Sequence, residues 1–373
     1  MNIELLHIQG YKSIADLKME NVDPFAIIAG SNGSGKSNLV DALAFLGTYV
    51  EFGVKTAMQH FGGYSNIQCF KLDEEHRTTI KFELKIEINS VKYHYSLGLF
   101  HLDSDASLSE HLTVDGKTII SRKVGEAPLV NTNDLADTLN SYNLPKQTSA
   151  LLFLPDSGLY HFLTNIKVFR FDPLAAKEPN ATSTDASELD IHGRNVASML
   201  AELEKDEDFR EQITEWMELL VPNMEKVTTE QQRLDGTTVI TFKEEGTDKK
   251  FPANLISDGT IYALCILTAL FSRSNTLGLT IIEEPERGIH PKAIAELISA
   301  IRDTASNRHP FFVTTHSESV VRCAKTSELW LSNKANGKTE VKNAALQTNG
   351  VDLGDMPLDK AWLMNIFSGG SPW

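Results

Sequence analysis

The chain has 373 residues, of which 41% are hydrophobic and 23% charged, as in an ordinary globular protein with one large domain or two joined ones. Its formal net charge of −15 argues against a protein that coats nucleic acid with a basic surface. No apolar run approaches the ~20 residues that span a bilayer, and the N-terminus lacks the segments of a secretory signal. Three widely separated cysteines, Cys69, Cys265 and Cys323, fit neither a disulfide framework nor a zinc site. We therefore expect a cytoplasmic protein without a membrane partner.

The N-terminal third alternates apolar and polar residues and therefore predicts strands and hairpins. These cover residues 3–9, 14–19, 78–100 and 108–122, and the continuously apolar run 25–29 predicts a buried strand. The last two hairpins should form an antiparallel β-lobe of at least four strands. Between the strands, a helix should run from Ser37 to about Val50, and an irregular loop should follow over 51–70.

The remainder of the chain mixes helical patterns with short strands. Helices are expected within 135–162, 195–220, 255–271 and 291–305, a polar linker at 179–187, and strands at 166–171, within 227–251, and at 277–282 and 310–315. Continuous apolar strands that alternate with helices indicate a parallel sheet covered on both faces. The predicted fold class is α/β, with a mixed or parallel sheet flanked by helices, an antiparallel β-lobe and a helical insertion. We expect one domain, 1–373, with lobes at 1–135, 136–250 and 251–373.

The most informative motif is a glycine-rich loop between the apolar strand at 25–29 and the helix that follows. It reads Gly30-Ser31-Asn32-Gly33-Ser34-Gly35-Lys36-Ser37. Such a loop wraps a phosphate chain, because its backbone N–H groups and the helix N-terminus point at negative charge. Lys36 would reach the β- and γ-phosphates, and the Ser37 hydroxyl would bind Mg²⁺. The sequence therefore predicts a nucleotide-binding protein.

Two later strands end in polar residues of the kind that act on a nucleotide. The apolar strand near 280 ends in Glu283 and Glu284. Glu283 is placed to hold Mg²⁺ through water, and Glu284 can polarise a water for in-line attack on the γ-phosphate. His316 follows the next apolar strand, at the sheet edge where ligands bind in open α/β folds, and is expected to contact the γ-phosphate.

In this order the motifs resemble the ABC-type ATPase heads of the RecF, SMC and overcoming-lysogenization-defect group. They resemble more closely the bacterial AAA-type ATPases of that group, many of which occur in phage-defence cassettes. Five further segments carry the resemblance. They are an opening strand and turn (Ile8–Ile14), a signature motif (Ser257–Thr260), a D-loop (Pro285–Pro291), a short Phe-Asp-Pro motif (Phe171–Pro173) and a C-terminal motif (Phe367–Gly370).

The resemblance implies an ATP hydrolase that uses Mg²⁺ and works as a head-to-tail homodimer around two ATP molecules. Lys36, Glu284 and His316 would be its catalytic residues, and Ser37 and Glu283 would hold the metal. Glu283 stands where many ABC proteins carry Asp. The glutamine loop of the family has no clear position, so Gln147 is the leading metal ligand, with Gln59 and Gln68 as weaker alternatives. The remaining nucleotide contacts would come from Lys12, Ser13 and Asn38, and from Ser257, Asp258, Gly259 and Thr260 of the partner copy.

The sequence predicts a bare head, because no coiled-coil arm precedes Glu283 and few residues follow His316. Asp352 and Asp355 are interpreted as loop residues rather than as a nuclease metal pair. The leading hypothesis is the sensor or motor subunit of an anti-phage complex whose effector is a partner protein from the same operon. A RecF-like DNA-repair ATPase and a low-turnover ATP-clamped scaffold are the alternatives. Nucleic acid and a higher oligomer stay open as partners.

Overall fold

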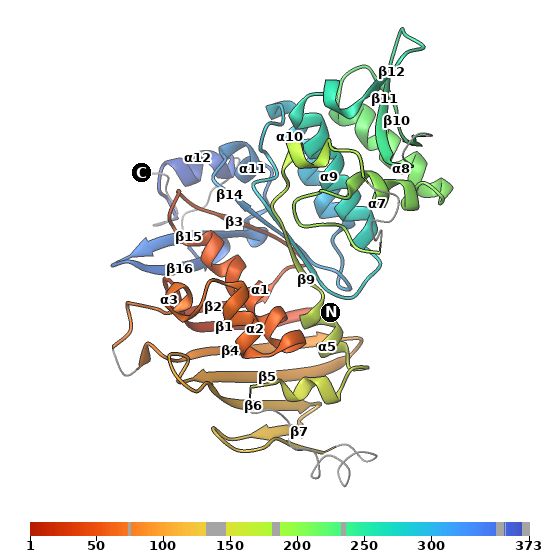
Figure 1. Ribbon diagram of the computed structural model, residues 1–373. Helices are drawn as coiled ribbons and strands as arrows, with labels where there is room; N and C mark the ends of the chain where they lie inside the picture. Colours follow the sequence, from red (N-terminus) through yellow and green to blue (C-terminus); the bar gives the residue numbers. More distant parts are fainter. Residues whose placement is uncertain are drawn as a thin grey trace. The chain divides into compact units, whose positions relative to one another are not determined.

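The computed structural model describes residues 1–73, 76–131, 147–180, 187–232, 236–347, 354 and 356–367. The chain folds into two compact units, each assembled from separated stretches of sequence. The first unit contains 1–166, 277–279 and 325–373, and the second contains 167–276 and 280–324. Each unit is described by itself below (Figure 1).

The first unit contains an antiparallel sheet of seven strands in the order β2-β1-β4-β5-β6-β7-β8. Apolar side chains on one face of this sheet are buried, among them Phe82, Leu84 and Leu97, and α1 and α2 lie across the sheet in Figure 1. The strands are β1 (Asn2–Tyr11), β2 (Ile14–Val22), β4 (Ile80–Ile88), β5 (Val91–Phe100), β6 (Ser107–Val114), β7 (Lys117–Arg122) and β8 (Leu129–Val130). The helices of this part are α1 (Lys36–Phe52), α2 (Val54–His60), α3 (Tyr64–Ile67), the 3₁₀ turn η2 (Ala150–Phe153) and α5 (Gly158–Thr164).

A second group of strands in the first unit surrounds the phosphate loop. The buried strand β3 (Phe25–Ala29) pairs in parallel with β15 (Leu329–Ala335), which forms a hairpin with β16 (Lys338–Asn343). Short helices complete this region: η4 (Thr326–Glu328), η5 (Ala344–Leu346) and α12 (Leu358–Leu363). The hairpin therefore lies directly beside the strand that leads into the loop.

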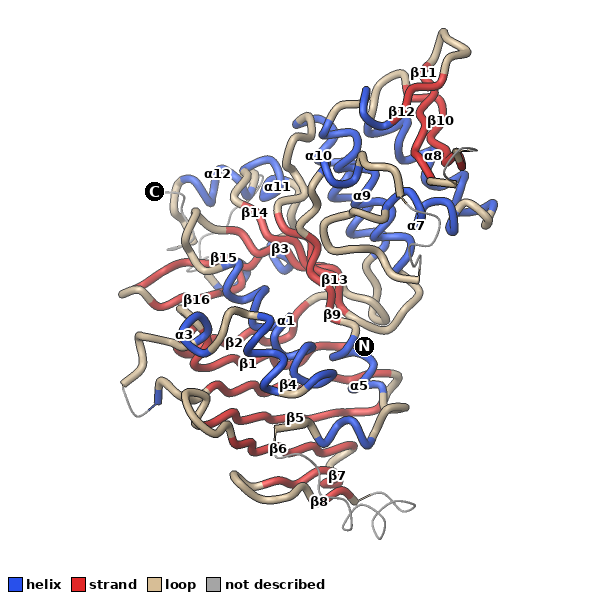
Figure 2. The backbone as a smooth tube through the Cα atoms, in the orientation of Figure 1, coloured by secondary structure: helices blue, strands red, loops and turns tan. Residues whose placement is uncertain are grey.

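The second unit combines parallel strands, long helices and a small three-stranded sheet (Figure 2). Its parallel pair is β13 (Leu279–Glu283) with β14 (Phe311–Thr315), and β9 (Ile166–Phe169) follows β13 in the strand order. The antiparallel sheet contains β10 (Met224–Gln231), β11 (Thr238–Glu244) and β12 (Lys250–Pro252). The helices are α6 (Pro173–Ala176), α7 (Val196–Leu203), α8 (Glu207–Leu220), the 3₁₀ turn η3 (Ala253–Leu255), α9 (Asp258–Arg273), α10 (Pro291–Thr304) and α11 (Glu318–Arg322).

The predicted hairpins, the buried strand before the loop and the helices near 195–220, 255–271 and 291–305 are confirmed. The irregular loop expected over 51–70 is wrong, because α2 and α3 lie there. Gly53 and Gly63, which look like loop signals in the sequence, instead cap these two helices with φ of 83° and 86°. The contiguous lobes expected from the sequence do not coincide with the two units, because β15 and β16 join the strand β3 from far along the chain.

Several predicted features lie outside the described residues. These are the first part of the helix expected at 135–162, most of the linker at 179–187, Asp352, Asp355 and the end of the C-terminal motif. Among the residues that the structure does describe, no helix is both long and apolar enough to cross a membrane.

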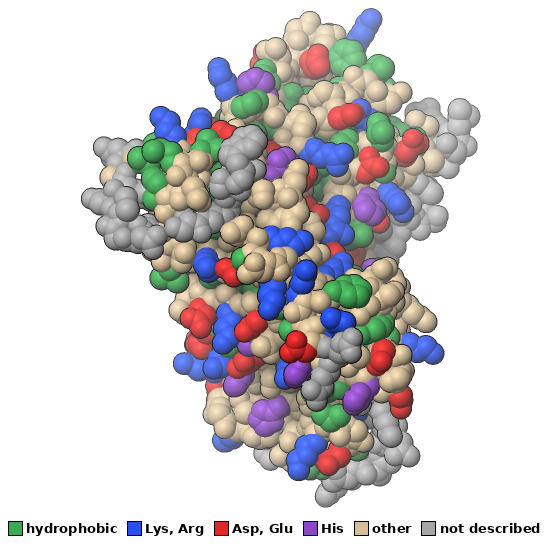
Figure 3. Space-filling model, turned by 90° about the vertical axis from the view of Figure 1, so that its left-hand side faces the viewer, with side chains coloured by type: hydrophobic (Ala, Val, Ile, Leu, Met, Phe, Trp, Pro, Cys, Tyr) green, Lys and Arg blue, Asp and Glu red, His purple; other side chains and the backbone are tan. Residues whose placement is uncertain are grey.

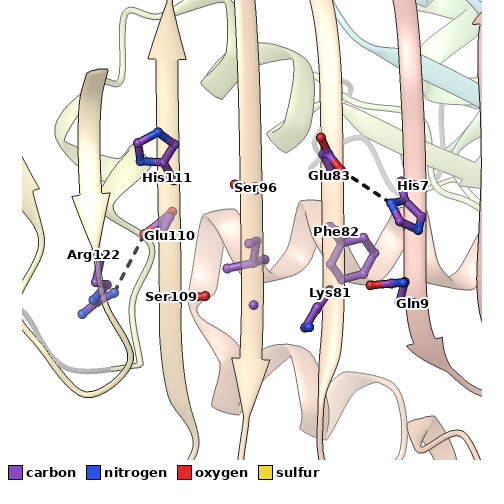
Figure 4. A pocket seen from close by; sticks show the side chains of 12 residues that line it. His7, Gln9, Lys81, Phe82, Glu83, Ser96, Ser109, Glu110, His111 and Arg122 are labelled. Atoms are coloured by element: carbon purple, nitrogen blue, oxygen red, sulfur yellow. Dashed lines mark ion pairs between the residues drawn. The ribbon is translucent and has the colours of Figure 1, made fainter. Parts of the chain in front are cut away.

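The outer face of the seven-stranded sheet is polar and holds a hollow of about 220 Å³ (Figure 4). On this face His7 lies 2.5 Å from Asp16 and 3.5 Å from Glu83, and His94 lies 2.8 Å from Glu83. Burial opposes ionisation of Glu83, but hydrogen bonds from both histidines lower the pKa of this carboxyl. The described residues that line the hollow include none from the phosphate loop.

A fully buried carboxylate ties the seven-stranded sheet to the segment before α5. Glu110 of β6 accepts hydrogen bonds from Tyr95 Oη at 2.7 Å, Ser149 Oγ at 2.6 Å and the Ala150 N–H at 2.7 Å. Arg122 Nη1 lies 3.9 Å from it. Burial raises the pKa of Glu110. Removing the carboxylate would leave three buried donors without their acceptor.

We expect Glu110→Ala to lower the free energy of unfolding by about 3–5 kcal/mol, because a buried charge partner and several hydrogen bonds are lost together. Glu110→Gln keeps an oxygen acceptor and should cost less than half as much. Urea unfolding followed by circular dichroism measures both, with Glu87→Ala at a more exposed position of β4 as the control. A loss below about 1 kcal/mol for Glu110→Ala would contradict the assigned role.

A buried histidine in the second unit must stay neutral. The ring of His309 lies 2.7 Å from Thr280 Oγ1 through Nε2 and 2.9 Å from the Thr276 carbonyl through Nδ1. Because the carbonyl only accepts, Nδ1 carries the proton and Nε2 accepts from Thr280. Arg273 Nε in turn donates to Thr280 Oγ1 at 2.8 Å. Burial and the nearby Arg273 charge lower the pKa of His309 from 6.5 to about 4.

Because the pKa of His309 is lower in the folded protein than in the unfolded chain, the free energy of unfolding depends on pH between these two pKa values. Between about pH 4 and 6.5 the unfolded chain takes up a proton at His309 that the folded chain does not, so stability falls as pH falls through this range. The full effect is about 3 kcal/mol. His309→Gln should remove this slope from urea unfolding measured between pH 7.5 and 4.5, whereas His111→Gln on the exposed sheet face should leave it. An unchanged slope in His309→Gln would overturn the assignment.

Candidate active site

The phosphate loop forms a strand–loop–helix turn that leaves its helix N-terminus open. The buried strand β3 ends at Ala29, and α1 begins at Lys36. The N-cap is Gly35, at φ 105°, and this residue has no side chain that could cap the first turn of α1. Uncapped N–H groups at a helix N-terminus favour an anion. The Ser37 hydroxyl lies on an exposed residue at this end.

Two further groups make the loop fit a phosphate. The Lys36 ammonium donates to the carbonyls of Gly30 at 2.8 Å and Ser31 at 3.0 Å, so its charge is held within the loop. The Ser34 hydroxyl is buried and has no hydrogen-bond partner among the described residues. Asn32 and Gly33 at the tip are exposed. A cationic loop with an unused buried hydroxyl has the donors that an anionic group requires.

Lys12 and Ser13, which are predicted to contact the nucleotide, form side-chain interactions next to the phosphate loop. Lys12 forms an ion pair with Asp41 of α1 at 2.5 Å. Asn38 Nδ2 donates to Ser13 Oγ at 2.5 Å, and Ser13 Oγ lies 2.6 Å from Thr339 Oγ1. Lys12 and Ser13 therefore contact the helix and the hairpin that flank the loop.

The structure does not bring Gln147 to the phosphate loop. Its carbonyl accepts from the Val54 N–H at 3.0 Å, and its side chain lies 3.4 Å from Asp105. Val54 follows the far end of α1, whose 17 residues span about 25 Å. This placement corrects the interpretation of Gln147 as the metal-facing glutamine. Gln68, one of the alternatives, forms an isolated β-bridge with Tyr11, the residue directly before Lys12.

In the second unit the predicted acids lie at the end of β13. Glu283 is the last residue of the strand, and its side chain is mostly buried. Arg170 donates to both of its oxygens, through Nε at 2.8 Å and through the Nη2 nitrogen at 3.2 Å. A bidentate pair of this kind holds a carboxylate in one orientation.

Glu284 and His316 face each other at the ends of two paired parallel strands. His316 Nδ1 lies 3.1 Å from Glu284 Oε1, and the Glu284 N–H donates to the Thr314 carbonyl at 2.8 Å. Glu284 has φ 51°, in the left-handed region that non-glycine residues rarely adopt and that clusters at functional sites. The Tyr262 hydroxyl, from α9, lies 3.0 Å and 3.1 Å from the carbonyls of Glu283 and Glu284. The two predicted residues are thus brought into hydrogen-bond distance.

The predicted signature forms the N-terminus of α9. Ser257 is the N-cap and accepts from the Thr260 N–H at 3.3 Å, while Asp258 pairs with Lys177 at 2.5 Å. A side chain at Gly259 would place its Cβ 2.0 Å from the Gly288 carbonyl oxygen, so only glycine fits there. The signature and the D-loop therefore pack against each other through backbone.

Sequence reasoning missed several residues that hold these groups. Arg170, Tyr262 and Thr339 orient them, as described above. Thr315 also donates to Glu286 at 2.6 Å, and burial raises the pKa of Glu286. Only the position of Thr315 beside His316 is a signal in the sequence. The other partners come from distant segments that no local pattern connects.

Residues 25–322 match the model of the protein family described as "AAA domain, putative AbiEii toxin, Type IV TA system". The matched segment includes the phosphate loop, the signature, both acids and His316. The chain belongs to this AAA domain family. Nucleotide binding is what membership in an ATPase family implies.

Solved structures share the fold of this chain. An SMC head bound to the C-winged helix domain of ScpA has a TM-score of 0.56 and 15% identity, and the similarity covers 91% of this chain and 97% of the other. The SMC head of Thermotoga maritima has a TM-score of 0.51 and 15% identity over 92% and 99% of the two chains. The fold is therefore that of an ABC-type ATPase head of the SMC kind, as predicted.

A curated relative is similar over a short stretch only. An uncharacterized protein of Methanocaldococcus jannaschii is 45% identical over 42 residues, which cover 11% of this chain and 19% of that protein. The chain thus matches about a fifth of the length of this relative.

Proposed function

We propose that this AAA family member binds and hydrolyses ATP at a site completed by a second copy of the chain. The observation that carries the proposal is the phosphate loop, with its uncapped helix N-terminus and the Lys36 ammonium held within it. Glu284 would act as the base that takes a proton from the attacking water, and His316 at 3.1 Å would hold it in position. A side chain that accepts a proton or positions the attacking water is a recurring part of phosphoryl-transfer sites.

Magnesium fits the donors that the chain offers. Mg²⁺ is commonly held by one or two protein oxygens together with substrate phosphates. Ser37 in the first unit would offer a hydroxyl and Glu283 in the second a carboxylate. Within the described part of the chain, no group of three or more His, Cys, Asp or Glu side chains is arranged to hold a metal ion. The metal would neutralise charge on the phosphates. Arg170 already pairs with Glu283 and competes for this carboxylate.

Dimerisation is supported by the exposed N-terminus of α9. Ser257 and Asp258 are exposed, and a helix N-terminus favours an anion. In the proposed dimer this end of one copy meets the γ-phosphate held by the phosphate loop of the other. The packing of Gly259 against Gly288 would bring the D-loop to the same interface.

The cellular role that we propose is the motor or sensor subunit of an anti-phage complex, with an effector protein encoded in the same operon. The family description names an AbiEii toxin of a type IV toxin–antitoxin system, which has more than one component and so supports a multi-component setting. One SMC head of similar fold is bound to ScpA, so heads of this fold carry protein partners. On the face drawn in Figure 3, acidic and basic side chains are interspersed, and the net charge is −15, which weighs against a broad DNA-binding surface.

Replacing Glu284 by Gln tests the assigned base. We expect kcat for ATP hydrolysis to fall by roughly 10²–10⁴, because the amide cannot accept the proton, while ATP binding persists. Phosphate release and calorimetric ATP binding measure the two effects. Glu296→Gln, at an exposed position of α10, is the matched control. Hydrolysis at the wild-type rate in Glu284→Gln would assign the base to another residue.

Replacing Ser257 by Arg tests the shared site. The variant should bind ATP normally through its own phosphate loop, yet lose ATP-dependent dimerisation and at least about 10²-fold in hydrolysis, because a bulky cation blocks the donors at the start of α9. Analytical ultracentrifugation with and without ATP measures dimerisation. Ser274→Arg, at the opposite end of α9, controls for the added charge. Normal turnover by Ser257→Arg would rule out the two-copy site.

A further inference from the structure

The phosphate loop is supported from behind by the hairpin of β15 and β16. The Ser34 carbonyl accepts hydrogen bonds from Ser332 Oγ at 3.3 Å and from Thr339 Oγ1 at 3.2 Å. Both of these hydroxyl side chains belong to buried residues, with exposures of 0% for Ser332 and 1% for Thr339. The carbonyl of the fifth loop residue is therefore fixed by two side chains some 300 positions away in sequence.

Thr339 also touches the loop and the first turn of the chain. A Cβ at Gly35 would lie 1.9 Å from Thr339 Oγ1, so the hairpin packs directly against the backbone of this glycine. The Thr339 N–H donates to the Ser13 carbonyl at 2.9 Å, and the two hydroxyls lie 2.6 Å apart. Thr339 thus joins the opening turn to the phosphate loop.

Thr339 belongs to a series of linked hydrogen bonds, and the groups at the two ends of this series determine which hydroxyl donates to which. At one end the Asn38 amide nitrogen donates to Ser13 Oγ at 2.5 Å, and at the other end the Ser34 carbonyl only accepts. Each hydroxyl in between has one proton. Ser13 must therefore donate to Thr339, and Thr339 must donate to the Ser34 carbonyl.

This arrangement determines which way one amide of the loop points. In a planar trans peptide the C=O and the following N–H point in opposite directions, and the described residues contain no cis peptide bond. Because the Ser34 carbonyl faces Thr339 and Ser332, the Gly35 N–H faces away from the hairpin. That is the side on which a phosphate loop holds its anion.

We propose that Thr339 is a positioning residue for phosphate binding, which it promotes by fixing the peptide between Ser34 and Gly35 with its N–H toward the phosphate. This inference rests on the proposed nucleotide-binding function and adds a residue to that site. Thr339 does not contact the nucleotide. Ser13 acts through Thr339 as well, since its hydroxyl is engaged by Asn38 and Thr339.

The test compares Thr339→Val, which keeps the shape of the side chain, with Thr339→Ser, which keeps the hydroxyl. Isothermal titration calorimetry with Mg²⁺ measures the Kd of ATP and of inorganic triphosphate. We expect Thr339→Val to weaken both ligands about tenfold, the equivalent of one hydrogen bond. Both should weaken by the same factor because the defect lies at the phosphates, and Thr339→Ser should restore both.

A matched control separates positioning from general loss of stability. Thr241 is a buried β-strand threonine of the second unit whose hydroxyl lies 3.0 Å from that of Thr228. Thr241→Val should lower the midpoint of thermal unfolding without changing either Kd. If Thr339→Val does not fold, Ser332→Ala removes the other donor to the Ser34 carbonyl and should weaken both ligands two- to threefold, since this is the longer bond.

The outcomes distinguish this inference from the function on which it rests. If the wild-type protein binds neither ATP nor triphosphate, the proposed function fails. If the wild type binds both and a folded Thr339→Val variant binds them equally well, only the role of Thr339 is overturned. Failure of Thr339→Ser to restore binding would likewise overturn it, because the hydroxyl would then not be the group responsible.

Discussion

The rest of the first unit depends on one constraint. The peptide N–H groups of the glycine-rich loop must point in the same direction before any anion binds to them. Backbone N–H groups repel one another when they converge, and glycine residues have little conformational preference. The chain meets this constraint from three sides. The buried strand β3 fixes the start of the loop, α1 fixes its end, and the hairpin of β15 and β16 fixes the Ser34 carbonyl between them.

The second unit solves a different problem, which is to hold charged side chains at strand ends. Glu283 is oriented by Arg170, and Glu284 by His316, while the Tyr262 hydroxyl binds both of their carbonyls. Tyr262 lies on α9, four residues after Asp258, so the helix that presents the signature also holds the turn that presents the acids. Close packing of Gly259 on Gly288 adds a second connection between them.

The sequence predicted the loop, the acids and the histidine because each is a local pattern: an apolar strand followed by specific residues. It also predicted most strands and long helices from periodicity. It failed where the information is not local. Order along the chain suggests Gln147 for the glutamine loop, but order does not measure distance, and Gln147 lies by Val54, beyond the C-terminal end of α1. Thr339 is 326 residues from Ser13, and no pattern in either segment indicates that they meet. The short helices α2 and α3 were missed because their capping glycines resemble loop residues.

The hydrogen-bond chain from Asn38 to Ser34 has a thermodynamic consequence. In a series of hydrogen-bonded hydroxyls, every donor and acceptor can exchange roles if neither end is fixed. Such a series therefore has two proton arrangements. Here a pure donor stands at one end and a pure acceptor at the other, so the protons have one arrangement only. The protons of the Ser13 and Thr339 hydroxyls are therefore already ordered when the chain folds. A ligand that binds at this loop does not have to order them and loses no entropy on their account.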